Sequence, residues 1–214
     1  MSAVTGNMSF LLRGLLATLE LTGLSFVFAF FIGLFVATAR VSPVRSLRGV
    51  GTAYVELFQN IPLLAWLVVF VFALPQAGFI LPLFQTAVLV LSLYEGAYVG
   101  EVVRSGINTI ARGQGEAARA IGLSTGQALR YVILPQAMRS VVQPLGNVFI
   151  ATTMATSLTA AVGVVELTSS ANSLDLQYAQ PIAIFVGAGI AYMAVNLIVG
   201  QVTGIVERRL AVER

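Results

Sequence analysis

The 214-residue chain contains no cysteine, no histidine and no lysine, and only 10% of its residues are charged. Ordinary soluble domains carry roughly 25% charged residues, so water is not the main solvent of this protein. Without cysteine the chain can form neither a disulfide framework nor a thiolate metal site. Without histidine it lacks the commonest metal ligand and the commonest general base. We therefore expect no catalytic residue and no metal site.

The lack of lysine also bears on nucleotide chemistry. A phosphate-binding loop of the form GxxxxGK(S/T) requires a lysine, so this chain cannot hydrolyse ATP through such a loop. The net charge of +3 comes from 12 arginines against 9 acidic residues. The arginines are scattered between apolar runs, which fits membrane topology better than nucleic-acid binding. We expect no nucleic-acid partner.

The chain is instead rich in apolar sequence, with 57% hydrophobic residues. About 20 apolar residues are needed to cross a bilayer as a helix, and the sequence predicts five crossings. Turn residues from Pro75 to Gly78 divide one long uncharged run, and the fourth helix is expected to begin afresh near Pro144 and Gly146. Residues 10–17 are typical of a short amphipathic helix on the membrane surface. The expected crossings are about 21–39, 54–74, 81–103, 145–165 and 181–206.

The arginines predict an orientation. If the amino terminus lies outside, only Arg13 is external, and the other 11 of the 12 arginines face the cytoplasm. The opposite orientation would reverse this distribution, so we expect an external amino terminus and a cytoplasmic carboxyl terminus. The first residues lack the positively charged start of a secretory signal, and we expect them to be retained. We see no linker or clear internal repeat, so the sequence predicts one transmembrane domain, residues 1–214.

One long polar passage, residues 112–136, interrupts the apolar sequence. It begins with a run from Glu116 to Ile121 whose small alanines favour a slim helix. Gly122 is expected to end this helix, and Ser124 with Gln127 has the spacing of a capping box for the next one. Pro135 is expected to kink or end the second helix. The passage therefore predicts a helix, a tight turn and a second helix.

The same passage carries a specific motif. Glu116-Ala117-Ala118, three residues, Gly122, nine residues, Val132, one residue and Leu134-Pro135 resembles the EAA loop of ABC-importer permeases, with Val132 in place of the usual isoleucine. Further matches extend the resemblance to the subfamily that takes up histidine, glutamine, arginine and glutamate. The stretch from Phe58 to Leu64 is similar to the subfamily's FRxxPLL segment, and Gly96 to Ile107 to its GAYxAExxRxGI segment. Gly113-Gln114, Pro135-Gln136-Ala137, Asn147, Thr156-Ser157-Leu158 and Glu166-Leu167 match further points in order.

The resemblance implies an all-α membrane protein of type I ABC importer permease architecture, with five transmembrane helices per subunit and a short cytoplasmic coupling helix. It implies a bacterial cytoplasmic (inner) membrane location and two permease subunits around one path. Two ATPase subunits would bind ATP and Mg inside, an extracytoplasmic substrate-binding protein would dock outside, and this chain would bind no cofactor itself. The candidate ATPase-coupling residues are Glu116, Ala117, Ala118, Arg119, Gly122 and Leu123. Glu116 could instead be a solvated surface charge, and Arg119 could face solvent or lipid headgroups.

Three residues depart from the subfamily pattern. Gln59 stands where arginine is frequent, Trp66 where glutamine is frequent, and Met154 where many members carry lysine. A lysine at position 154 could meet a substrate carboxylate. In this chain either hydroxyl and backbone donors hold that carboxylate, or a different partner subunit supplies the cation. The second alternative favours a heterodimer over a homodimer.

Several polar residues within the expected helices are candidates for the substrate path. An ionised Glu95 inside the third helix costs at least a few kcal/mol unless it is paired or hydrated. It could meet a substrate amino or guanidinium group, or pair with another helix or subunit. Glu101 and Arg104, three residues apart, favour a structural ion pair. The other candidates for the path are Gln59, Asn60, Thr153, Met154 and Ser157. Hydroxyl side chains in membrane helices also commonly bond their own backbone.

The sequence thus predicts a permease subunit of an ATP-driven importer for a polar amino acid, associated with membrane lipid and catalysing no bond change. A self-contained secondary transporter or channel is the main alternative. It would need ion-coupling carboxylates or a polar filter within one chain, and Glu95 is the one candidate that we identify. A membrane scaffold without transport activity is the second alternative. The identity of the amino acid stays open.

Overall fold

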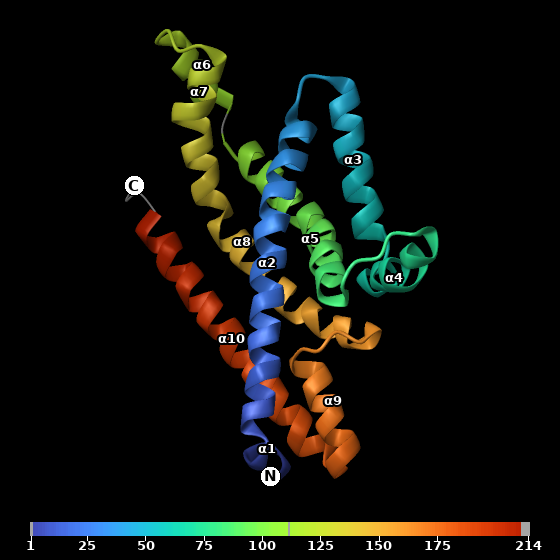
Figure 1. The fold of residues 1–214 in the computed structure, drawn as a ribbon. Coiled ribbons are helices and arrows are strands. Elements are labelled where there is room, and N and C mark those ends of the chain that lie inside the picture. Colours follow the sequence, from blue (N-terminus) through green and yellow to red (C-terminus); the bar gives the residue numbers. More distant parts are fainter. Residues whose placement is uncertain (1, 111, 211–214) are drawn as a thin grey trace.

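The computed structural model describes residues 2–110 and 112–210. Within these ranges the chain forms helices and turns and no strand, so the expected all-α fold is confirmed. Figure 1 shows long helices running between two ends of the molecule, with α1 and α9 at one end and α6, α7 and the α2–α3 turn at the other. The elements are α1 Ser2–Gly6, α2 Met8–Val41, α3 Arg45–Asn60, α4 Leu63–Val68, η1 Val69–Ala73, η2 Leu74–Ala77, α5 Leu83–Asn108, α6 Arg112–Ala120, α7 Thr125–Ala128, η3 Leu129–Ile133, α8 Leu134–Ala155, η4 Thr156–Val162, α9 Leu167–Tyr178 and α10 Pro181–Leu210.

The pair of α2 and α5 forms the centre of the bundle. Of an 18-residue apolar stretch of α5, 61% is buried inside the protein, whereas only 11% of the corresponding stretch of α10 is buried. The two central helices approach closely at Gly33 of α2 and Gly100 of α5, and neither glycine leaves room for a Cβ atom. Small residues allow this approach in membrane proteins, where packing and not hydrophobic burial drives association between helices.

The first long helix begins earlier than the sequence predicts. The separate surface helix expected over residues 10–17 is wrong, because these residues belong to α2, which is continuous from Met8. No proline interrupts this stretch, and Gly14 and Thr18 are buried against the start of α9. At 1.5 Å per residue the 34 residues of α2 extend about 51 Å. The helix is therefore longer than the hydrocarbon core of a bilayer, about 30 Å.

The second expected crossing, residues 54–74, is broken near its middle. α3 ends at Asn60, and the chain bends by 97° into the segment Leu63–Ala77. Pro62 explains the break, because it lacks a backbone N–H and disfavours helical geometry at Ile61, whose φ and ψ are −108° and 129°. The expected turn after Pro75 is present, since Gly78 adopts a φ of 88° after η2.

The fourth crossing also differs from the expected 145–165. α8 starts at Leu134, passes through Pro144 without ending, and is continued by the 3-10 segment η4 as far as Val162. Membrane helices tolerate proline where neighbouring groups satisfy the freed backbone carbonyl. The predicted start of a new helix near Pro144 is therefore wrong. α5 and α10 lie close to the expected ranges 81–103 and 181–206.

Among the described residues, four helical segments are long and apolar enough to cross a membrane. They are α2, α5, the segment Pro135–Val162 and α10, and the number becomes five if the bent pair of α3 with Leu63–Ala77 is one span. α9 is a separate helix of 12 residues between η4 and α10. The fold thus presents two distinct ends, one with the α6–α7 hairpin and one with α9 (Figure 1).

Candidate functional site

The polar passage between α5 and α8 forms a hairpin of short helices, here called the α6–α7 hairpin (residues 112–128). Gly122 ends α6 in the left-handed conformation with a φ of 93°. Its N–H donates to the carbonyl of Arg119 at 3.0 Å, and the N–H of Leu123 donates to that of Ala118 at 3.2 Å. This pair of hydrogen bonds is a helix-ending motif that strongly favours glycine. The turn predicted at Gly122 is confirmed.

The second half of the hairpin begins with the predicted capping box. The N–H of Ser124 donates to Oε1 of Gln127 at 2.8 Å, and the N–H of Gln127 donates to Oγ of Ser124 at 3.3 Å. Pro135 lies in the first turn of α8, directly after the π-helical η3. A proline is tolerated in a first turn, so the chain stays helical and changes helix type at this point.

The six candidate coupling residues differ in exposure. Glu116, Ala117, Arg119 and Gly122 are exposed, whereas Leu123 is half-buried and Ala118 is buried. α6 packs against α7 and η3, so Ala118 serves the inside of the hairpin and is not free for another protein. Ile121, 80% exposed, lies at the turn and was not among the predicted coupling residues. A large apolar side chain in a charged, solvent-facing turn is the signal that could have identified it.

Glu95 lies on α5 at the wall of a cleft of about 500 Å³ between α5 and α8, here called the α5–α8 cleft. The residues that line it are Tyr94, Glu95, Tyr98, Val102, Pro144, Asn147, Val148 and Ala151. The hydroxyl groups of Tyr94 and Tyr98 lie 3.3 Å apart. The cleft therefore combines a carboxylate, an amide and two phenol groups within an otherwise apolar bundle.

The Glu95 side chain is 3% exposed as part of a buried helix face, yet it has no ion-pair or hydrogen-bond partner among the described residues. The neighbouring Glu101, by contrast, pairs with two arginines. A buried carboxylate without a partner is costly in the membrane unless water, another subunit or a ligand reaches it. Pairing of Glu95 with another helix of this chain, one of the two sequence-based interpretations, finds no support in the structure.

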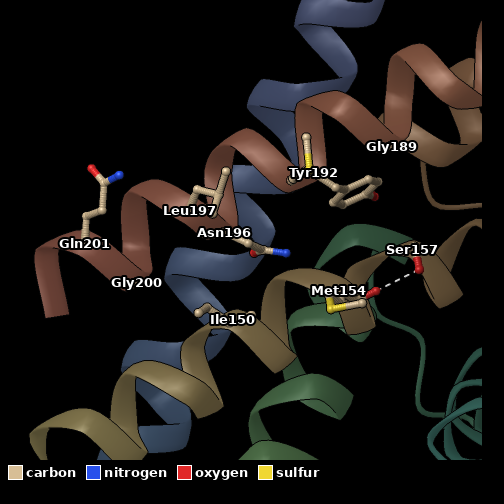
Figure 2. A pocket seen from close by; sticks show the side chains of 10 residues that line it. Ile150, Met154, Ser157, Gly189, Tyr192, Asn196, Leu197, Gly200 and Gln201 are labelled. Carbon is tan, nitrogen blue, oxygen red and sulfur yellow. Dashed lines mark hydrogen bonds between the residues drawn. The ribbon is translucent and has the colours of Figure 1, made fainter. Parts of the chain in front are cut away.

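Met154 and Ser157 lie on a second cleft, of about 820 Å³, between α8–η4 and α10. Figure 2 shows both residues facing α10, from which Tyr192 and Asn196 point back toward α8. The hydroxyl of Ser157 donates to the carbonyl of Met154 at 2.7 Å, and Oδ1 of Asn196 is buried without a hydrogen-bond partner in the described chain. We call this opening the α8–α10 cleft. Tyr192 and Asn196 were not predicted.

Three of the predicted path residues lie elsewhere. Thr153 is fully buried, and its hydroxyl donates to the carbonyl of Phe149 at 3.0 Å. Gln59 and Asn60 are at the end of α3, next to the bend, and line neither cleft. The side-chain amide of Asn60 donates to the carbonyl of Glu56 at 2.8 Å. The structure therefore brings Glu95 to one cleft and Met154 and Ser157 to the other. The remaining three predicted path residues line neither cleft.

A cluster of charges joins α2 and α5 near the start of the hairpin. Glu101 pairs with Arg104 on the next turn, which confirms the predicted ion pair, and also with Arg40 of α2, which was not predicted. These contacts fix the carboxyl-terminal parts of the two central helices to each other. Within residues 2–110 and 112–210, no group of three or more acidic, cysteine or histidine side chains is placed to hold a metal ion.

Comparison with known proteins gives consistent matches over nearly the whole chain. Residues 29–212 match the family described as binding-protein-dependent transport system inner membrane component. The chain is 32% identical over 209 residues to the probable glutamine ABC transporter permease protein GlnM of Bacillus subtilis, with 98% of this chain and 97% of that protein covered. It is 36% identical over 217 residues to the glutamate transport system permease protein GluC of Corynebacterium glutamicum, with 95% of each covered.

Comparison of the fold with solved structures agrees with the sequence matches. A chain in the crystal structure of an amino acid ABC transporter with histidines superposes with a TM-score of 0.91, at 30% identity and with 96% of each chain covered. The architecture expected from the motifs is therefore confirmed. The chain belongs to the family of inner membrane components of binding-protein-dependent transport systems, and it is a multi-pass permease of the ABC transporter type.

Proposed function

We propose that this chain is the permease subunit of an ATP-driven importer that takes up a polar amino acid. The observation that carries the proposal is the α6–α7 hairpin, which presents the exposed Glu116 and Ala117 of the EAA motif at one end of an apolar helical bundle. The relatives named as glutamine and glutamate permeases support the class of cargo. The chain supplies a path and moving helices, while ATP and Mg²⁺ would bind to two separate ATPase subunits.

The hairpin is the proposed contact with an ATPase subunit. Glu116 offers a charge, Ala117 allows close approach, and Ile121 offers an apolar side chain that is 80% exposed. Hydrogen bonds around Gly122 make the turn rigid, and α6 packs on η3, which continues into α8. Movement of a docked ATPase would therefore be transmitted to α8 as a rigid-body displacement. Ala118 and Leu123 support the hairpin from within, and Arg119 adds charge to its surface.

The proposed orientation places the hairpin in the cytoplasm and the amino terminus outside. Arg40, Arg45 and Arg48 flank the α2–α3 turn, which lies at the same end of the molecule as the hairpin (Figure 1). An excess of arginine on one side is typical of the cytoplasmic face of a membrane protein. The opposite end, with α9, would then face the extracytoplasmic substrate-binding protein.

The cargo path would run along α8, which borders both clefts. The unpaired carboxylate of Glu95 suits the amino or guanidinium group of a polar amino acid. Met154 and Ser157 border the α8–α10 cleft, where the side chain of Met154 is 59% exposed. A second permease subunit would complete the path, and a heterodimer agrees with the absence of a cation at position 154.

Association with the ATPase tests the role of the hairpin. Ile121→Ser is expected to reduce recovery of the ATPase subunit with the purified permease, and Glu116→Lys is expected to do the same. Leu176→Ser is a matched control, because Leu176 is 87% exposed on α9 at the opposite end. Glu56→Lys, on an exposed position of α3, controls for the change of charge. Wild-type recovery of the ATPase with both hairpin variants would contradict the proposed docking.

Uptake into vesicles separates an ATP-driven importer from a secondary transporter. The complete assembly is expected to take up a polar amino acid with ATP and without an ion gradient. The permease chain alone, given an ion gradient and no ATPase, is expected to transport nothing. Robust gradient-driven uptake by the chain alone would overturn the proposed function.

A further inference from the structure

The carboxylate of Glu166 is completely buried at the start of α9 and pairs with no cation among the described residues. Glu166 is the N-cap of α9, and its Oε1 accepts a hydrogen bond from the backbone N–H of Ser169 at 2.7 Å. In the sequence, Glu166 stands out only as one match to a family pattern. Its burial indicates a role inside the protein.

The second carboxylate oxygen joins two other helices. Oε2 accepts hydrogen bonds from the hydroxyl of Tyr192 on α10 at 2.6 Å and from the hydroxyl of Thr18 on α2 at 3.3 Å. The oxygen of Thr18 in turn accepts the backbone N–H of Leu167 at 3.1 Å. One carboxylate and one hydroxyl therefore fix the first turn of α9 to both α2 and α10. We call Thr18, Glu166 and Tyr192 the α9 anchor.

The contact between α9 and α2 leaves little freedom for sliding. A Cβ atom built on Gly14 of α2 would lie 2.9 Å from Cβ of Ser170 and 3.0 Å from Cα of Leu167. These distances are shorter than real Cβ contacts, so α9 lies directly on the backbone of α2. A displacement of α9 must therefore either break the α9 anchor or move Tyr192 with it.

Tyr192 belongs to the anchor and also to the α8–α10 cleft. Its side chain lines the cleft together with Met154 and Ser157 (Figure 2). Its hydroxyl is held by Glu166 and lies 3.0 Å from the hydroxyl of Thr168 on α9. The position of this ring in the cleft wall is thus set by groups that belong to α9.

We propose that Glu166 is a positioning residue that links the position of α9 to the shape of the α8–α10 cleft through Tyr192. Displacement of α9 from outside would change the cleft wall, and changes in the cleft would alter the docking of α9. The inference deepens the proposed function, because that function makes α9 the end facing the substrate-binding protein and α8 a border of the cargo path.

The first test uses the purified chain in lipid nanodiscs and needs no partner. Glu166→Gln replaces an oxygen that accepts hydrogen bonds with an NH₂ group that cannot accept them, although position 166 does not itself line the cleft. Because the one remaining oxygen can serve only Ser169 or the two hydroxyls, we expect amide exchange in the first turn of α9 to accelerate about tenfold or more and the methyl NMR signals of Met154 and Met193 to shift. The signals of Met8 and Met138, which do not line the cleft, are internal controls.

Further variants separate a link to the cleft from a merely structural role. Tyr192→Phe keeps the ring and loses the hydroxyl, and it is expected to accelerate exchange in α9 as Glu166→Gln does. Thr18→Ser keeps a hydroxyl and should show near-wild-type amide exchange in α9. Thr18→Val loses the hydroxyl and should show faster exchange. Tyr178→Phe makes the same chemical change at the end of α9, outside the anchor. Faster exchange in α9 with unchanged signals of Met154 and Met193 would overturn the proposal, as would unchanged exchange in Glu166→Gln.

The second test measures ATPase activity and uptake of the complete importer. Glu166→Gln is expected to lower stimulation of ATPase activity by the substrate-binding protein and to leave the basal ATPase activity unchanged, because the anchor holds α9, a helix on the side of the molecule away from the hairpin (Figure 1). Equal stimulation in the variant and the wild type would overturn the functional part of the proposal. Absence of uptake by the wild-type assembly would instead contradict the proposed function and would leave the result of the NMR test valid.

Discussion

Substitution of Gly33 by alanine tests the close contact between the two central helices. A Cβ atom at position 33 would lie 2.8 Å from the backbone nitrogen of Gly100, and closer still to the side chain of Val99. Val99 is fully buried and β-branched, so it cannot swing aside easily. Because the facing atoms belong to backbone or to a confined side chain, α2 and α5 must move apart to accommodate one methyl group.

The magnitude follows from two opposing effects. Alanine gains about 1 kcal/mol over glycine in helix propensity, while overpacking of a tight core costs about 1–3 kcal/mol. Gly23→Ala on the same helix receives the first effect alone, because a Cβ atom at position 23 meets nothing within 4 Å. The free energy of unfolding of Gly33→Ala should therefore be lower than that of Gly23→Ala by about 1–3 kcal/mol.

The assay is reversible unfolding of both variants in mixed detergent micelles, followed by circular dichroism. A thermal scan of the same samples should show a midpoint lower by roughly 2–12 °C in Gly33→Ala than in Gly23→Ala. Equal free energies and equal midpoints for the two variants would refute the packing described for α2 and α5.

Three further substitutions have expected outcomes. Glu95→Gln should raise the KM for uptake of a cationic amino acid by about tenfold or more, because it removes a charged hydrogen-bond acceptor from the α5–α8 cleft. Glu101→Gln should lower the free energy of unfolding by about 1 kcal/mol, since the contact with Arg40 is partly exposed; detergent unfolding measures this change. Ser124→Ala should lower the stability of the start of α7 by about 1 kcal/mol. Faster amide exchange at Gln127, whose N–H donates a hydrogen bond to Ser124, measures this change.

Each of these outcomes has a matched control. Glu56→Gln, on an exposed position of α3, should leave the KM unchanged and should leave the free energy of unfolding within a few tenths of a kcal/mol of the wild type. Thr125→Ala changes the hydroxyl next to the capping box and leaves its two hydrogen bonds intact. An unchanged KM in Glu95→Gln would contradict the role of Glu95 in the path. Equal amide exchange in Ser124→Ala and Thr125→Ala would contradict a stabilising role of the cap.

The sequence predicts that long apolar helices cross the membrane, because hydropathy can be read from each segment of the sequence by itself. The two prolines show where such reasoning ends. Pro62 coincides with a bend of 97°, whereas Pro144 lies inside a continuous helix. The outcome depends on whether neighbouring elements satisfy the freed backbone groups, which a single segment does not reveal. The same holds for residues 10–17, whose place in α2 depends on packing against α9.

For the candidate sites, local chemistry was predictable and contacts between distant segments were not. Gly122 and the capping box were identified because their hydrogen bonds lie within a few residues. The clefts depend on which face of α8 meets each neighbour. Thr153 and Met154 are adjacent in sequence, yet one is fully buried and the other borders a cleft. The hydrogen bond from Tyr192 to Glu166 joins residues 26 apart, and no local pattern indicates it.

The shallow burial of α10 has a mechanical consequence. This helix is held on one side by Ala188, in the cluster with α9, and by Tyr192 in the α9 anchor, and on the other side by Thr203, which lies directly against Gly146 of α8. Ala188 and Thr203 are 15 residues apart, about 22 Å at 1.5 Å per residue, and the α8–α10 cleft lies between them. Because α10 is held on both sides of the cleft, it cannot rotate about one end as a rigid body. The cleft can widen only if α10 bows or rolls, and Gly189 and Gly200, which both line it, are the points of least stiffness.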